Sequence, residues 1–166
     1  RKLTDHAIKF RARGRDPGDD GFRIPLDDGE RFFPWIRSYR WSRGESNDYA
    51  VASGLMALEA WAHQRVEKGD NFEAVLKDVL GPPGTSAAFL LIAVDMIISH
   101  WPESRNAAVP FLACPELVSL DRTRQSQDLI EYPDLFGLKA LEKEPVGSAT
   151  RDSLKRRPSR RVPLER

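Results

Sequence analysis

Apolar residues recur at helical spacing through the middle of the chain, a pattern typical of amphipathic helices. The first stripe is formed by Val51, Leu55, Leu58 and Ala62. It predicts a helix over about 48–68, preceded by polar residues with N-cap chemistry and ended by a glycine.

A second stripe of apolar residues predicts a helix over 72–80. Asp70 and Glu73 have the spacing of a capping box before it, and Gly81, followed by a proline, stops it. Because the connection between the first two helices is short, we expect them to pack as an antiparallel hairpin.

A third predicted helix, over about 86–100, is apolar on almost every face. A helix of this kind is buried on all sides, so we predict that it forms the centre of the core. Two partner helices cannot cover it, and further cover must come from the rest of this chain or from neighbouring segments. Shorter helices are predicted over 103–108 and 115–127, with Pro110 breaking the chain between them.

The residues before the first helix carry a hairpin signal. Asp27, Asp28 and Gly29 lie between two short apolar runs, which indicates a β-hairpin or an extended lead-in. Pro25 and Pro34 argue against central strands, so any sheet here should be small.

These patterns together predict an all-α fold of packed helical hairpins. The expected division is a basic lead-in over 1–45, a helical domain over 46–146 and a disordered basic tail over 147–166. Short helices joined by tight turns around one apolar helix resemble a slice of a helical-repeat array, whose members rely on neighbours for cover.

Composition narrows the classes of function. The chain has 166 residues, of which 40% are hydrophobic and 31% charged, and its net charge of +1 favours no particular partner. The single cysteine, Cys114, excludes an internal disulfide and a multi-cysteine zinc site. The longest apolar stretch is shorter than the roughly 20 residues of a membrane span, and no secretory leader precedes it. We therefore expect a cytoplasmic protein without a membrane partner and, because residue 1 is an arginine, a segment of a longer chain.

The turn over 81–86 resembles the beginning of a nucleotide-binding P-loop, but its chemistry is incomplete. A P-loop follows a strand and needs a lysine for the phosphates and a hydroxyl for magnesium. Here two alanines follow Ser86, and the turn follows a helix. We interpret it as a helix stop before a new helix, and we expect no nucleotide, metal or other cofactor.

Titratable residues on the predicted helices have structural interpretations. Glu59, His63 and Glu67 recur every four residues, so the outer two are about 12 Å apart along the helix axis. Because they cannot all reach one metal ion, we predict a solvated face with ion pairs and not a metal site. Asp95 lies in the most apolar helix, where an unpaired carboxylate is costly. It is predicted to pair with an arginine or to reach solvent through a gap; the alternative is the acid of an enzyme whose other groups are not evident.

One stretch interleaves basic and aromatic residues: Arg37, Tyr39, Arg40, Trp41 and Arg43. It could contact nucleic acid together with the tail over 148–166, whose seven basic and two acidic residues give it a net charge of +5. The other interpretation is an aromatic cluster that anchors the lead-in, with arginines stacked outside. We prefer the anchor and keep nucleic-acid binding as the alternative function.

Two stretches carry a resemblance to known proteins: Leu-Met-Ala-Leu-Glu-Ala-Trp at 55–61 and Val-Pro-Phe-Leu-Ala-Cys-Pro-Glu-Leu at 109–117. With the Gly69-Asp70 turn, they resemble the helical region of very large bacterial ATP-binding proteins, over about 35–128. Those proteins join a P-loop ATPase module to long helical arrays, and some are thought to act in defence against phage. The resemblance implies that ATP chemistry belongs to another part of the parent chain, because no phosphate-binding residue carries over.

The expected function is therefore a non-catalytic scaffold or coupling segment of a larger bacterial multidomain protein. Its expected partners are adjacent helical segments of the same parent, or another protein. Such a segment should expose an apolar patch on its helices, larger than soluble monomers usually show.

Overall fold

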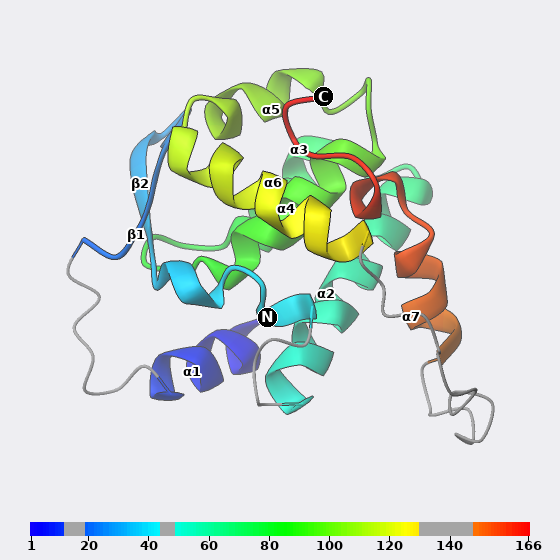
Figure 1. Cartoon of the computed structure of the whole chain (residues 1–166), viewed down its shortest axis with the longest axis horizontal. Helices are drawn as coiled ribbons and strands as arrows, with labels where there is room; N and C mark the ends of the chain where they lie inside the picture. The colour runs from blue at the N-terminus through cyan, green and yellow to red at the C-terminus, as the bar shows by residue number, and fades with distance from the viewer. Residues whose placement is uncertain (12–18, 44–48, 130–147) are drawn as a thin grey trace.

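The computed structural model describes residues 1–11, 19–43, 49–129 and 148–166. These residues are mostly helical, with one small two-stranded sheet among them (Figure 1), so the predicted all-α fold with a hairpin lead-in is confirmed. The predicted domain boundaries near 45 and 147 lie outside the described residues.

In chain order the helices and strands are α1 (Lys2–Arg11), β1 (Gly21–Leu26), β2 (Gly29–Pro34), α2 (Tyr49–Glu67), α3 (Phe72–Leu80), α4 (Ala88–Ser99), α5 (Arg105–Leu112), α6 (Pro115–Leu129) and α7 (Ser148–Lys155). Short 3-10 turns are η1 (Ile36–Ser38), η2 (Trp41–Arg43) and η4 (Pro158–Arg160). Helices α2 to α6 correspond to the five helices predicted from the sequence, with bounds that differ by a few residues.

The strands β1 and β2 pair in antiparallel fashion, with Phe22 opposite Phe33. Gly29, at the start of β2, has a φ of 112°, which side-chain-bearing residues rarely adopt, so the tight turn depends on it. Because the sheet has only two strands, both are edge strands, and Pro25 and Pro34 are tolerated within them.

Helices α2 and α3 pack against each other, as expected for a hairpin. The N-cap of α3 is Asn71 rather than Asp70, and its side-chain oxygen accepts a hydrogen bond from the Ala74 amide at 2.9 Å. At the other end, Gly81 has a φ of 66° and ends α3. The turn that follows is thus the predicted helix stop.

Helix α4 is the centre of the core, as predicted. Every residue from Ala88 to Ile97 is at most 1% exposed. The cover comes from α2, α3, α5, η2 and η4. Of the two sources of cover that the sequence allows, the rest of this chain is therefore the one observed.

Large apolar side chains remain exposed on several different elements. They are Leu3, Phe10, Tyr49, Trp61, Trp101, Val109, Leu112 and Leu129. Leu3 and Trp61 line one groove between α1 and α2, whereas the others lie on other parts of the surface or on helix ends. None of the described helices has both the length and the hydropathy needed to cross a bilayer.

The predicted disorder of 147–166 is wrong for residues 148–166. This stretch forms α7 and η4, and it buries Leu154, Ser159 and Leu164. Composition predicted disorder because apolar residues are few, but long-range hydrogen bonds and ion pairs hold the segment in place. Figure 1 shows the C-terminal end returning across the helices that precede it.

Two further features differ from the sequence predictions. Helix α1 was not predicted, because Ile8 is its one buried residue and no apolar stripe marks it. Pro110 lies inside α5 instead of breaking the chain, so the helix continues without the hydrogen bond that a backbone N–H would donate there.

Candidate functional site: a buried charge network

The five residues of the predicted basic and aromatic patch do not share one surface. Arg37 is exposed, whereas Tyr39 is fully buried. Arg40 and Trp41 are half-buried, and Trp41 packs against the core. The Arg43 side chain is only 8% exposed and lies among carboxylates. The aromatic members thus anchor the lead-in to the core, and Arg43 belongs to a different kind of site.

That site is a buried network of three arginines and four carboxyl groups among the described residues. Its members are Arg43, Arg124, Arg160, Glu59, Asp95, Asp121 and Asp128. We call this set the charge network. It joins α2, α4 and α6 to the turns η2 and η4, so it connects elements from both halves of the chain.

Arg43 is the centre of the first half of the network. Its Nη2 donates to Asp95 Oδ1 at 2.7 Å, and its Nη1 lies 3.5 Å from Glu59 Oε2. Its Nε lies 3.3 Å from both carboxylate oxygens of Asp128. The sequence prediction that Asp95 pairs with an arginine is therefore confirmed, and Arg43 on η2 is that arginine.

Arg124 is the centre of the second half, and neither it nor Asp121 is exposed. Its Nε and Nη2 donate to the two oxygens of Asp121 at 3.0 and 2.9 Å, a bidentate pair one turn apart on α6. Its Nη1 donates to Asp128 Oδ2 at 3.2 Å. Asp128 is thus shared by Arg43 and Arg124 and links the two halves.

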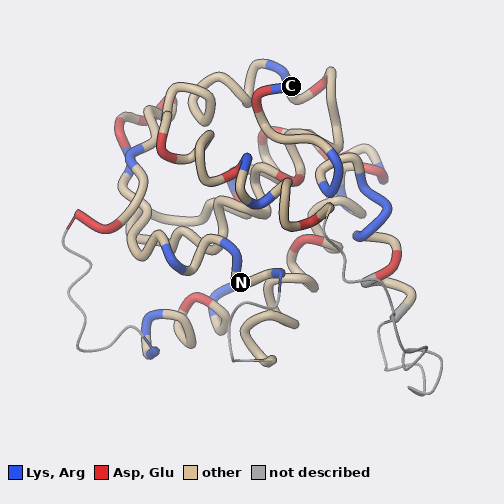
Figure 2. Tube along the Cα trace, in the orientation of Figure 1, with Lys and Arg blue, Asp and Glu red and all other residues tan. Residues whose placement is uncertain are grey.

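Arg160 brings the C-terminal segment into the network. Its Nη2 lies 2.8 and 3.1 Å from the two oxygens of Glu59, a residue 101 positions earlier in the chain. Basic positions are concentrated at the C-terminal end of α7 and in the residues after it (Figure 2), and Arg157 also pairs with Glu67 at 2.6 Å. Ion pairs with α2 therefore neutralise part of this basic segment.

Proton binding can balance the charges of the network. Burial raises the pKa of Glu59 well above its ordinary value, and the charge of Asp95 raises it further, while Arg43 opposes the shift. Burial also raises the pKa of Asp95, again against the effect of Arg43. Burial thus favours the protonated form of both carboxyl groups, whereas the charge of Arg43 favours their ionised form.

Tyr39 extends the network toward the β-hairpin. Its hydroxyl donates to Asp121 Oδ1 at 2.9 Å, and its ring meets that of Phe22 edge to face with centroids 5.8 Å apart. Burial raises the pKa of the Tyr39 hydroxyl well above its ordinary value, and the charge of Asp121 adds to the shift. Tyr39 therefore stays a neutral donor and not a nucleophile or base.

The predicted solvated face of α2 is wrong for two of its three residues. Glu59 and His63 are fully buried, and only Glu67 is exposed. His63 Nδ1 lies 2.9 Å from His100 Nε2, a contact between α2 and the end of α4. Burial, together with the nearby charge of Arg157, lowers the pKa of His63 to about 3, so the imidazole is neutral near pH 7. The C-terminal segment covers this face, which no local spacing rule reveals.

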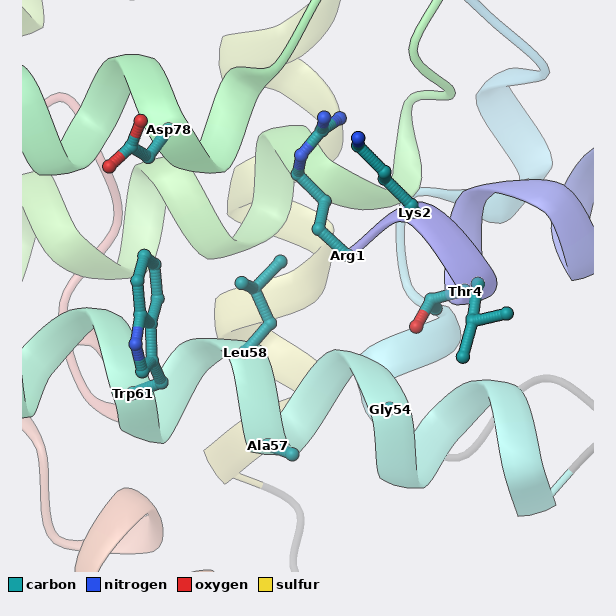
Figure 3. A pocket seen from close by; sticks show the side chains of 9 residues that line it. Arg1, Lys2, Thr4, Gly54, Ala57, Leu58, Trp61 and Asp78 are labelled. Atoms are coloured by element: carbon teal, nitrogen blue, oxygen red, sulfur yellow. The ribbon is translucent and has the colours of Figure 1, made fainter.

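A shallow groove of about 630 Å³ lies between α1, α2 and α3 (Figure 3). Leu58 and Trp61 rise from α2 along its floor. Leu3, on α1, also lines the groove. Arg1 lies across the groove from α2, and Asp78 lies on the α3 side. The groove therefore combines an apolar floor with charged groups at its rim, and it contains no part of the charge network.

Other groups in the described ranges offer no reactive arrangement. No set of three or more His, Cys, Asp or Glu side chains there is placed to hold a metal ion. Cys114 is buried, and burial raises the pKa of its thiol, which leaves it in the unreactive protonated form.

Sequence reasoning identified Asp95 as a buried carboxylate but missed Glu59, Asp121 and Arg124. A partial signal existed for α6, where Asp121, Arg124 and Asp128 are spaced at three and four residues. Comparison with known proteins adds nothing to this geometry: no protein-family model, no curated protein and no solved structure matches the chain.

Proposed function

We propose that the chain is a non-catalytic helical coupling segment of a larger bacterial multidomain protein, whose ATP chemistry belongs to other parts. The observation that carries the proposal is the position of the charge network. Glu59, Asp95 and Arg124 are fully buried, yet together they tie three helices to the turns η2 and η4. A catalytic acid or base must reach a substrate, whereas a buried network of ion pairs holds the helices of a coupling segment rigidly together.

The closed core determines which residues contact the neighbouring segments in this proposal. Because the chain itself covers α4, the segment functions as a self-contained unit and not as an open slice of a repeat array. Its contacts with adjacent helical segments must then be made by surface residues. The groove of Leu3, Leu58 and Trp61 is suited to that role, since aromatic residues with apolar neighbours are enriched where protein surfaces meet.

Nucleic-acid binding, the alternative function, has less support. Binding of phosphates depends on exposed cations, and it weakens with salt as each contact releases counterions. Arg43 is buried among carboxylates, Arg160 pairs with Glu59, and Tyr39 is fully enclosed. Arg37 is the member of the predicted patch that remains exposed.

The proposal predicts that the groove becomes covered in the longer protein. Trp61, 40% exposed in this chain, would be replaced by cysteine in a Cys114→Ala background and labelled with a nitroxide. In the isolated chain the label should collide freely with a water-soluble paramagnetic reagent, as measured by electron paramagnetic resonance. In the protein with its flanking helical segments, that accessibility should fall several-fold, because an adjacent helix excludes the reagent.

A nitroxide at Glu73 provides the matched control, since Glu73 is exposed on α3 and does not line the groove. Its accessibility should stay the same in both proteins. Equal accessibility of the Trp61 label with and without the flanking segments would contradict the coupling role of this groove.

A further inference from the structure

The stretch over 159–164 is held in the way that a binding site holds a peptide ligand. Side chains of α6 contact its main chain: Arg124 donates to the carbonyls of Ser159 and Val162, the second at 3.2 Å. Gln125 Nε2 donates to the Arg161 carbonyl at 3.2 Å. Such contacts hold the main chain of a turn and do not depend on a particular side chain.

The same helix also accepts a hydrogen bond from a main-chain amide of the segment. Asp121 Oδ2 accepts a hydrogen bond from the Leu164 amide at 2.7 Å. Asp121, Arg124 and Gln125 are spaced at three and four residues on α6, so they lie along one face of that helix. One helix face therefore supplies both donors and an acceptor to a passing chain.

Two side chains of the segment act as anchors. The Arg160 guanidinium, 12% exposed, reaches Glu59 on α2, and Leu164, 7% exposed, packs into the core cluster. Arg161, between them, directs its side chain to solvent. An arginine and a leucine four positions apart thus determine which sequence fits. The main-chain hydrogen bonds between them fix the position of the segment along α6.

The buried groups that hold the 159–164 stretch need a segment in that position. Glu59 is fully buried, and without Arg160 its nearest positive group is Arg43 Nη1 at 3.5 Å. Arg124 would likewise lose two carbonyl acceptors. Buried groups that lose their partners are strongly unfavourable, so an empty groove favours any segment that restores them.

We propose that Glu59, Asp121, Arg124 and Gln125 form a peptide-binding site, the docking groove, for an Arg-x-x-x-Leu segment that folds into a short 3-10 turn. Its partner in trans is the 159–164 stretch of a second copy of this chain. Each copy carries both the groove and the segment, so reciprocal exchange closes a two-fold dimer without any new interface chemistry.

The length of the connection permits this exchange. Eighteen residues, 130–147, separate α6 from α7. A chain of that length spans up to roughly 60 Å when extended, so it does not force the segment onto its own copy.

The test uses the full chain with its own segment weakened by Arg160→Ala and Leu164→Ala. A fluorescent peptide of residues 155–166 is added, and anisotropy follows its binding. We expect saturable binding, reduced roughly tenfold or more when the peptide carries Arg160→Ala, because a buried charged hydrogen bond is lost. A peptide with Arg161→Ala has the same net charge as the Arg160→Ala peptide and should bind as the unmodified peptide does. No binding, or equal binding of the two variant peptides, would overturn the proposal.

A second experiment covers the case in which the weakened chain does not fold, and it tests whether the segment comes from a second copy. If the weakened chain loses its helical circular dichroism, the wild-type chain is instead cut once within 130–147 at an introduced protease site, and exchange of the labelled peptide is measured. The same dependence on Arg160 is expected. In the intact wild type, gel filtration should show a dimer fraction that grows with concentration and is absent from the Arg160→Ala, Leu164→Ala chain. A wild type that stays monomeric up to millimolar concentration would overturn the assignment to a second copy.

Discussion

Replacing Arg124 with alanine is expected to lower the free energy of unfolding by about 3–5 kcal/mol, because the change leaves buried carboxylates without their charge partner. Arg124 is fully buried and donates to both oxygens of Asp121 and to Asp128. It also holds the carbonyls of Ser159 and Val162. Since small domains have only about 5–15 kcal/mol of stability, the variant should be close to unfolded at modest denaturant.

Urea denaturation followed by circular dichroism measures this effect. Arg122→Ala is the matched control on the same helix, since the Arg122 side chain is 65% exposed and pairs with Glu165 at the surface. The control should change stability by less than about 1 kcal/mol. Similar losses for the two variants would show that the buried network contributes no more than a surface ion pair.

Leu91→Ala is expected to lower the stability by roughly 2–5 kcal/mol, because it opens a cavity in the centre of the core. Leu91 is 0% exposed, and α4 is enclosed by elements from both halves of the chain, so the site has little freedom to collapse. Leu3→Ala removes the same atoms from a side chain that is 87% exposed and serves as the control. An unchanged urea midpoint for Leu91→Ala would contradict the central position of α4.

The sequence predicted the helices that have a continuous apolar stripe. Val51, Leu55 and Leu58 mark α2, and the uninterrupted apolar run identifies α4 as the core helix, because local spacing reports directly on which face is buried. The hairpin was predictable from its Asp-Gly turn for the same reason: turn chemistry is local.

Burial of charge was only partly predictable. Asp95 lies within an apolar run, which shows that its carboxylate needs a partner. The identity of that partner, Arg43, depends on how η2 packs against α4, a contact between residues 52 positions apart. Glu59 and His63 have the spacing of an exposed ion-paired face, and only the packing of the C-terminal segment makes them interior.

The order of residues 148–166 was not predictable from composition. A basic stretch with few apolar residues satisfies the usual criteria for disorder. Its stability comes instead from single anchors. Arg160 pairs with Glu59, 101 positions earlier, and the Leu164 amide donates to Asp121, 43 positions earlier. The Leu164 side chain packs into the core. Helix α7 illustrates the same limit, since Leu154 is its buried apolar residue and no stripe marks it.

The network also bears on how the proposed coupling segment would transmit force. Arg43 belongs to η2, which precedes α2, and Arg160 belongs to η4, near the C-terminal end, yet both contact Glu59. A displacement of either η2 or η4 is therefore resisted by the same buried carboxyl group. This arrangement suits a unit that holds its neighbours at fixed separation.

The central claim is that the C-terminal segment is an integral part of the folded core, fixed by the charge network. Amide hydrogen exchange at Leu164, followed by nuclear magnetic resonance, tests it most directly, because this N–H donates to Asp121 Oδ2 at 2.7 Å in the buried network. The account predicts that Leu164 exchanges as slowly as the amides of α4, which open only with global unfolding. Exchange of Leu164 at the rate of an unstructured peptide, while α4 stays protected, would contradict the account.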